Sequence, residues 1–284
     1  MDQHHLGDIV VTRIVESEDP FRTLPVLFPE APPEDFERHR HWLEPWALCP
    51  VTGKIVLPVQ SYLVRTRRHR ILIDTCVGND KSAEWHPPWH RRQDKAWPER
   101  LAAAGVRPED IDYVLCTHLH GDHCGWNTTL RDGRWVPSFP NARYIIAKRE
   151  FDHCQSLGTP VFSESIEPVV ESKQAVLVET DHALDDEVWL EPTPGHTPGH
   201  VAIRLASKGA RAIMSGDVMH SPIQCAHPEW AFVSDRDPAM ARATRRSLLE
   251  SACEQGTLVL TAHFPSPSLG RIEAEGDAFR FRYT

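Results

Sequence analysis

Residues 112–124 read Asp112-Tyr113-Val114-Leu115-Cys116-Thr117-His118-Leu119-His120-Gly121-Asp122-His123-Cys124. The apolar run near the start predicts a short strand buried in a sheet, and three His and one Asp follow it within six residues. His118 and His120 lie two positions apart at the end of this strand, and Gly121 permits a tight turn toward Asp122 and His123. Imidazoles and carboxylates gathered in this way indicate a metal site. Two pairs of such residues favour two adjacent cations, because a tetrahedral zinc site takes only about four ligands.

Length and composition limit what this stretch can belong to. The 284 residues are 40% hydrophobic and 25% charged, which fits one large domain or two small ones with an ample core. No Gly- or Ser-rich linker divides the chain, so we predict a single domain over residues 1–284. The net charge of −9 argues against a nucleic-acid partner, and the lack of a run of about 18 apolar residues argues against a membrane-spanning helix.

The beginning of the chain and the cysteines predict a cytoplasmic protein. Residues 1–5 contain neither the basic nor the apolar region of a signal peptide. The seven Cys form no Cys-x-x-Cys pair, which is typical of reduced and mostly buried thiols.

The pattern along the chain predicts many short strands interleaved with a few helices, hence a mixed α/β sandwich. We expect strands at 9–15, 55–66, 70–75, 113–116, 143–147, 175–178, 188–191, 200–205, 210–214 and 258–260, and a hairpin at 271–283. We expect helices at 98–105, 148–157, 163–171 and 239–254. Residues 18–53 are rich in Pro and lack clear periodicity, so we interpret them as an arm or lid that caps the site or pairs across a homodimer.

Three further stretches place one metal-ligand type of residue directly after a short apolar strand. His196 lies in a turn flanked by Pro and Gly, Asp217 follows the strand that ends at Met214, and His263 follows Leu258–Leu260. A ligand delivered by a rigid strand loses little entropy when it binds.

The order of these motifs resembles the metallo-β-lactamase superfamily over about residues 55–264. The motifs are Thr-His-x-His-x-Asp-His, then Gly-His, Gly-Asp and Ala-His. The resemblance implies a four-layer αββα sandwich with two metals at one edge. It implies the following ligands: His118, His120 and His196 for one metal, Asp122, His123 and His263 for the other, and Asp217 bridging both. It also implies that Asp74 supports a ligand His by a hydrogen bond, with Cys76 where the family usually has Gly.

Departures from individual branches narrow the expected activity. True β-lactamases lack the bridging Asp, diiron flavoproteins carry Glu at the position of His120, and persulfide dioxygenases use one iron. RNA-processing members need basic clamps, and glyoxalase-II-like hydrolases add a helical C-terminal segment. The remaining branch contains lactonases, arylesterases and organophosphate hydrolases. Acyl-homoserine lactonases place a Tyr three residues after the bridging Asp, where this chain has His220, which could serve as a hydrogen-bond donor or proton shuttle.

The resemblance thus predicts a binuclear zinc hydrolase of a small carboxylic ester or lactone, although the ligands also tolerate Mn or Fe. Two cations about 3.5–4 Å apart can lower the pKa of a shared water to roughly 7, which supplies a hydroxide nucleophile. We expect Asp122 to carry the proton to the leaving group. The alternatives are a phosphotriester hydrolase, an iron-dependent redox protein and a catalytically silent binding protein.

Several other residues carry weaker predictions. Trp85, Trp89 and Trp126 are interpreted as walls of an apolar substrate pocket, with the covering of a small core patch as the alternative. His200 is expected to be structural. The Arg242–Arg246 cluster is expected to form a solvated helix face.

Overall fold

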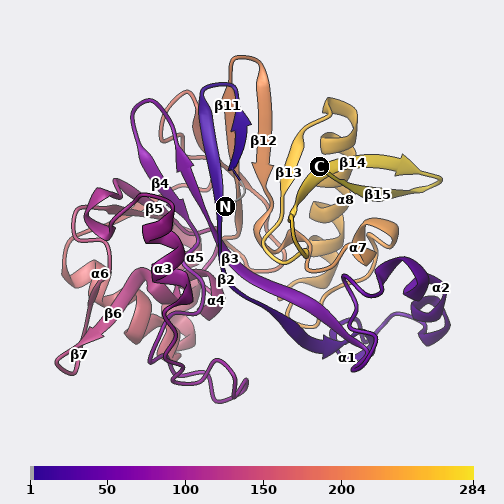
Figure 1. The fold of residues 1–284 in the computed structure, drawn as a ribbon, viewed down its shortest axis with the longest axis horizontal. Helices are drawn as coiled ribbons and strands as arrows, with labels where there is room; N and C mark the ends of the chain where they lie inside the picture. Colours follow the sequence, from indigo (N-terminus) through magenta and orange to yellow (C-terminus); the bar gives the residue numbers. More distant parts are fainter. Residues whose placement is uncertain (1–2) are drawn as a thin grey trace.

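Two β-sheets packed face to face form the centre of the computed structural model, which describes residues 3–284 (Figure 1). The first sheet has the order β1-β2-β3-β4-β5-β8-β9. Its strands are β1 (Gln3–Leu6), β2 (Ile9–Thr23), β3 (Lys54–Arg65), β4 (Arg70–Ile73), β5 (Tyr113–Leu115), β8 (Arg143–Ala147) and β9 (Ala175–Val178). The second sheet runs in order from β10 to β15. Its strands are β10 (Val188–Pro192), β11 (Val201–Ser207), β12 (Ala210–Met214), β13 (Leu258–Leu260), β14 (Leu269–Glu275) and β15 (Ala278–Tyr283).

Helices cover the outer faces of both sheets, and shorter ones lie in the connecting segments. They are α1 (Leu24–Leu27), α2 (Pro33–Leu43), α3 (Ala96–Ala103), α4 (Gly121–Cys124), α5 (Lys148–Leu157), α6 (Glu167–Glu171), α7 (Ile223–Ala226) and α8 (Pro238–Gln255). Figure 1 shows α3, α5 and α6 on the side of the first sheet and α8 on the side of the second. Short helical turns lie at Pro108–Asp110, Gly125–Asn127, Phe162–Ile166 and Gly216–Val218, and β6 (Thr128–Arg131) pairs with β7 (Arg134–Pro137) in a separate hairpin.

Alternation along the strands explains the layers. In β4, Ile71 and Ile73 point into the apolar cluster between the two sheets, whereas Leu72 points into the cluster under the helices of the first sheet. In β13, Leu258 and Leu260 likewise face the other sheet, while Val259 faces the cluster that contains Leu248 and Leu249 of α8. Strands buried on both faces give uninterrupted apolar runs, as seen in the sequence. The predicted αββα sandwich is confirmed.

Two strand pairs determine where functional side chains converge. β4 and β5 are parallel neighbours in the first sheet, and β12 and β13 are parallel neighbours in the second. The carboxyl ends of parallel neighbours lie at the same edge of a sheet. Two segments therefore leave the same edge of each sheet, and the contacts of Asp217 with His118 and His263 bring the segments of the two sheets together.

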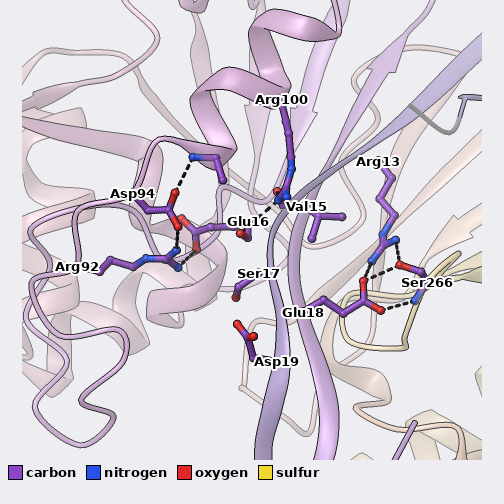
Figure 2. A pocket seen from close by; sticks show the side chains of 11 residues that line it. Arg13, Val15, Glu16, Ser17, Glu18, Asp19, Arg92, Asp94, Arg100 and Ser266 are labelled. Atoms are coloured by element: carbon purple, nitrogen blue, oxygen red, sulfur yellow. Dashed lines mark hydrogen bonds and ion pairs between the residues drawn. The ribbon is translucent and has the colours of Figure 1, made fainter. Parts of the chain in front are cut away.

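Strand β2 contacts both the loop that contains Arg92 and the C-terminal segment that contains Ser266. A register shift between Val15 and Ser17 interrupts its pairing with β3. Figure 2 shows Glu16 directed toward the Arg92 loop and Glu18 directed toward Ser266 in the other half of the chain. The Glu16 carboxylate accepts hydrogen bonds from the backbone N–H groups of Val77 and Gly78 at 3.0 and 3.1 Å.

The beginning of the 18–53 segment differs from the prediction. β2 continues to Thr23 and stays paired with β3, so the predicted strand end at Val15 is wrong. The register shift explains this difference, because it breaks the alternating pattern on which the prediction depends. Beyond β2, α1 buries Leu24 and Leu27, and α2 buries Phe36 and Leu43. Phe28 and Phe36 contact Trp230.

One predicted helix is shifted. We expected Pro98 to begin a helix that stops at Gly105, whereas α3 spans Ala96–Ala103. Pro98 is the third residue of α3, within the first turn, where backbone N–H groups have no partner inside the helix. Within residues 3–284, no helix is both long and apolar enough to cross a membrane.

Candidate metal centre

The seven side chains expected to bind metals meet at the edge of the sandwich where the parallel strand pairs end. Their ligand-type atoms fall into two groups, in each of which the atoms lie within 4.8 Å of one another. One group is His118, His120, His196 and Asp217, and the other is Asp122, His123 and His263. This division matches the one that the family resemblance implies.

Asp217 lies between the two groups and is almost completely buried. Its Oδ2 is 3.2 Å from His196 Nε2 and 3.6 Å from His118 Nε2. Its Oδ1 is 3.1 Å from His123 Nε2 and 3.0 Å from His263 Nε2. The carboxylate therefore presents one oxygen to each group, as a bridging ligand would.

Outward hydrogen bonds orient three of these imidazoles. Nδ1 of His123 faces Asp74 Oδ2 at 2.8 Å, as expected for Asp74, and Nδ1 of His263 faces the carbonyl oxygen of Pro58 at 2.7 Å. Nδ1 of His196 faces Asp235 Oδ1 at 2.9 Å. A proton held on Nδ1 by such an acceptor leaves the lone pair of Nε2 free and directed inward.

His120 has the opposite orientation. Its Nδ1 points inward, 3.0 Å from both His118 Nε2 and His196 Nε2. Three imidazole nitrogens that face one another across about 3 Å need a proton or a cation between them, because a hydrogen bond requires one donor per contact.

The donor set fits a pair of metal ions. Asp217 Oδ1 is buried and makes no hydrogen bond, and such an orphaned carboxylate oxygen is costly without a cation. Five imidazoles and two carboxylates suit zinc, and carboxylate oxygens also accept Mn or Fe.

The ionisable groups of the centre have pKa values shifted in different directions. Burial, together with the neighbouring imidazole of His196, lowers the pKa of His120 to about 3. Burial acts in the same direction on His196, but the carboxylates of Asp217 and Asp235 outweigh it and raise the pKa of His196 to about 9. Despite burial, the surrounding imidazoles hold the pKa of Asp217 well below its usual range, so the carboxylate stays ionised.

Asp235 and Arg245 support the centre, and neither role was predicted. Arg245 is fully buried and donates hydrogen bonds at 2.8 Å to the carbonyl oxygens of Val218, Pro228 and Trp230. It also lies 3.3 Å from Asp235 Oδ2, so it neutralises the carboxylate that orients His196. The prediction of a solvated helix face is therefore wrong at Arg245.

The sequence spacing could have indicated that Arg245 is buried. It lies on the same face of α8 as the other buried residues, which are Ala241, Leu248, Leu249 and Ala252.

His200 and His220 both contact Asp217. His200 Nε2 accepts a hydrogen bond from the backbone N–H of Asp217 at 3.0 Å, which fits the structural role expected for it. His220 Nε2 lies 3.0 Å from Asp217 Oδ2, and its ring stacks on Phe232 with centroids 3.5 Å apart. Burial lowers the pKa of His220 to about 4.

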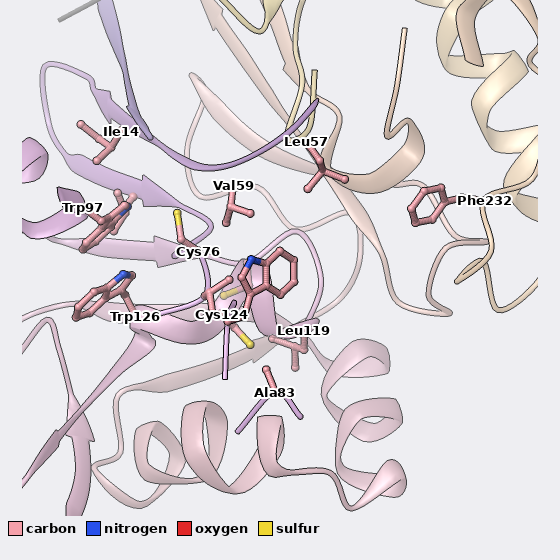
Figure 3. Close-up of a cluster of buried hydrophobic side chains, with 14 of the residues drawn as sticks. Ile14, Leu57, Val59, Cys76, Ala83, Trp97, Leu119, Cys124, Trp126 and Phe232 are labelled. Carbon is pink, nitrogen blue, oxygen red and sulfur yellow. The ribbon is translucent and has the colours of Figure 1, made fainter. Parts of the chain in front are cut away.

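A cavity of about 480 Å³ opens onto the centre. Its floor includes Asp122, His220 and His263, and most of its remaining wall is apolar. Trp85 and Trp89 line it, as expected. Trp126 does not; it stacks on Trp97 in the core with ring centroids 5.4 Å apart (Figure 3). The alternative interpretation, core covering, holds for Trp126.

The two-sheet sandwich and the clustered His and Asp side chains at its edge are typical of a class of metal-dependent hydrolases. A model of the family described as the metallo-beta-lactamase superfamily matches residues 55–273. The chain belongs to this superfamily, as the sequence motifs indicated.

Relatives named N-acyl homoserine lactonase share part of the sequence. The one from Bacillus cereus is 29% identical over 168 residues, which cover 56% of this chain and 62% of the relative. The one from Bacillus thuringiensis is 26% identical over 236 residues, which cover 76% of this chain and 85% of the relative. The chain thus spans less than two thirds of the first relative.

Solved structures of the same fold align along almost the whole chain. The hydrolase AbOPH of the beta lactamase superfamily aligns with a TM-score of 0.83 and 25% identity, covering 99% of this chain and 96% of the other. AidC, described as a dizinc quorum-quenching lactonase in complex with a product, aligns with a TM-score of 0.79 and 21% identity, covering 100% and 97%.

Replacing Arg245 with Met should lower the free energy of unfolding by about 3–5 kcal/mol, because Asp235 would keep a buried charge without its partner. Urea denaturation followed by circular dichroism measures the change. The adjacent Arg246 is the control: its side chain is 47% exposed, so Arg246→Met should change stability by less than about 0.5 kcal/mol. Equal effects of the two changes would contradict the role given to Arg245.

Proposed function

We propose that the protein is a binuclear metal-dependent hydrolase, with zinc as the expected metal, that cleaves a carboxylic ester or a lactone. The observation that carries this proposal is the buried Asp217 carboxylate, which faces both groups of ligand-type atoms at the floor of an apolar cavity. The names of the lactonase relatives support the same reaction class.

The seven residues at the sheet edge would hold the two cations, His118, His120 and His196 one of them and Asp122, His123 and His263 the other, with Asp217 between them. When bound, the cations would lower the pKa of a water molecule to near 7 and polarise the substrate carbonyl.

Asp122 is placed to move the proton. It lines the cavity, its side chain is 16% exposed, and its Oδ2 lies 3.7 Å from His263 Nε2. A carboxylate there can accept the proton of the attacking water and return it to the oxygen of the leaving group as the carbon–oxygen bond breaks. The products are one acid and one alcohol, joined in a single molecule when the substrate is a lactone.

His220 would orient the substrate. It lines the cavity on the Asp217 side, and stacking on Phe232 fixes its ring. Because burial lowers its pKa to about 4, the imidazole is neutral at pH 7 and carries one N–H. Its Nε2 lies 3.0 Å from Asp217 Oδ2, and it would donate to a substrate carbonyl oxygen when the cations engage that carboxylate instead.

The apolar part of the cavity indicates a substrate with an apolar group beside the ester. Leu119, Val161 and Trp89 contribute to this wall. Phe21, at the end of β2, lines it too, which supports our interpretation of the 18–53 segment as a lid. The homodimer and the cytoplasmic location stay predictions.

Asp217→Asn should lower kcat/KM by at least about 10³-fold for every substrate, because the amide has only one oxygen to share between two cations. The substrates to be tested are lactones, aryl esters and phosphotriesters, and each is assayed with the zinc-loaded protein. Turnover that survives the substitution would refute the proposal. Preferred turnover of triesters would move the assignment to a phosphotriester hydrolase, and bound iron with visible absorbance would favour the redox alternative.

His220→Phe should lower kcat by about 10²–10⁴-fold with little change in KM, because the ring still stacks on Phe232 but has lost its donor. Steady-state kinetics measure both constants. Zinc content should match the wild-type protein, since His220 is not among the expected ligands. An unchanged kcat would remove His220 from the catalytic residues.

A further inference from the structure

A buried glutamate joins the two loops that supply the first group of imidazoles. We propose that Glu150 is a positioning residue that holds the His118–His120 loop and the His196 loop at the separation that one metal ion needs. This inference rests on the proposed function, because it requires those imidazoles to bind a metal.

The contacts of Glu150 reach both loops. Its Oε1 accepts a hydrogen bond from the backbone N–H of Leu119 at 3.0 Å. Its Oε2 accepts hydrogen bonds from the Thr197 hydroxyl at 2.7 Å and from the Gly199 N–H at 3.1 Å. Leu119 lies between His118 and His120, and Thr197 directly follows His196. Each oxygen of one carboxylate therefore holds one loop.

The packing leaves little room for another arrangement. Glu150 lies in the first turn of α5 and is 2% exposed. A Cβ atom on Gly199 would lie 2.2 Å from the backbone nitrogen of Glu150, so the His196 loop rests directly on the helix. Any larger residue at position 199 would push that loop away from α5.

The charge of Glu150 also indicates a specific role. None of the ion pairs among residues 3–284 includes Glu150, so three hydrogen bonds and the positive end of α5 compensate a buried carboxylate. Burying a carboxylate without a cation is unfavourable compared with an apolar residue of similar size. Only a carboxylate offers an acceptor at each end, and that is what a link between two sets of donors requires.

Both carboxylate oxygens of Glu150 already accept hydrogen bonds from the protein, so Glu150 differs in role from Asp122. Glu150 lines the cavity but has no unused oxygen directed at a substrate. It acts through the loops rather than as a base.

The test measures zinc binding by the metal-free full-length chain, in competition with a chromophoric chelator. The wild-type protein should bind two Zn²⁺ per chain with two measurable dissociation constants. In Glu150→Gln the oxygen of the amide can hold one loop, but its NH₂ faces a backbone N–H of the other, that of Gly199 or that of Leu119. One dissociation constant should rise about 10–100-fold, while the other stays within threefold.

Two backgrounds identify the affected site. In His263→Ala, the remaining zinc should bind through His118, His120 and His196, and Glu150→Gln should weaken it. In His196→Ala, the remaining zinc should bind through Asp122, His123 and His263, and Glu150→Gln should leave its dissociation constant unchanged. The control is Glu16→Gln, because Glu16 is 4% exposed and also accepts two backbone hydrogen bonds, but from Val77 and Gly78 and not from either of these loops. Both zinc constants should survive that change.

Different failures have different meanings. A wild-type protein that binds no zinc would refute the proposed function itself. A wild-type protein with two zinc ions and unchanged constants in Glu150→Gln would overturn only the role of Glu150. If that variant does not fold, Thr197→Val decides, because it removes one donor to Oε2 and keeps the shape. It should raise the same constant about 3–10-fold, and no change would overturn the inference.

Discussion

The centre depends on one buried carboxylate surrounded by imidazoles. Asp217 is only 3% exposed, and each of its two oxygens faces imidazole nitrogens from both halves of the chain. Such a charge is stable only if cations or protonated neighbours surround it. The outward hydrogen bonds of His123, His196 and His263 fix how those neighbours present their lone pairs. Without metal, burying these groups together would lower the stability of the folded protein. With metal, the same groups would bind the cations tightly.

The sandwich makes this arrangement possible by collecting strand ends. β4 and β5 end beside each other in one sheet, and β12 and β13 do so in the other. The segments after them carry Asp74, His118, Asp217 and His263. The rigid strands place these side chains before any ligand arrives.

The sequence predicted most of the layers and the seven side chains of the centre because both leave local patterns. Buried strands appear as apolar runs, and each expected ligand follows such a run. The supporting residues leave no such pattern. Asp235 and Glu150 act through loops that become neighbours only when the sheets pack, and Arg245 was misinterpreted because its charge suggested solvent. Trp126 shows the same limit, since only packing reveals that it stacks on Trp97 rather than on a substrate.

The central claim is that seven side chains hold two cations on either side of Asp217. Diffraction from crystals of the zinc-loaded protein, measured on both sides of the zinc absorption edge, tests it most directly. The account predicts two anomalous peaks, one beside His118, His120 and His196, and one beside Asp122, His123 and His263, with Asp217 between them. A single peak away from Asp217, or no peak at this edge of the sandwich, would contradict it.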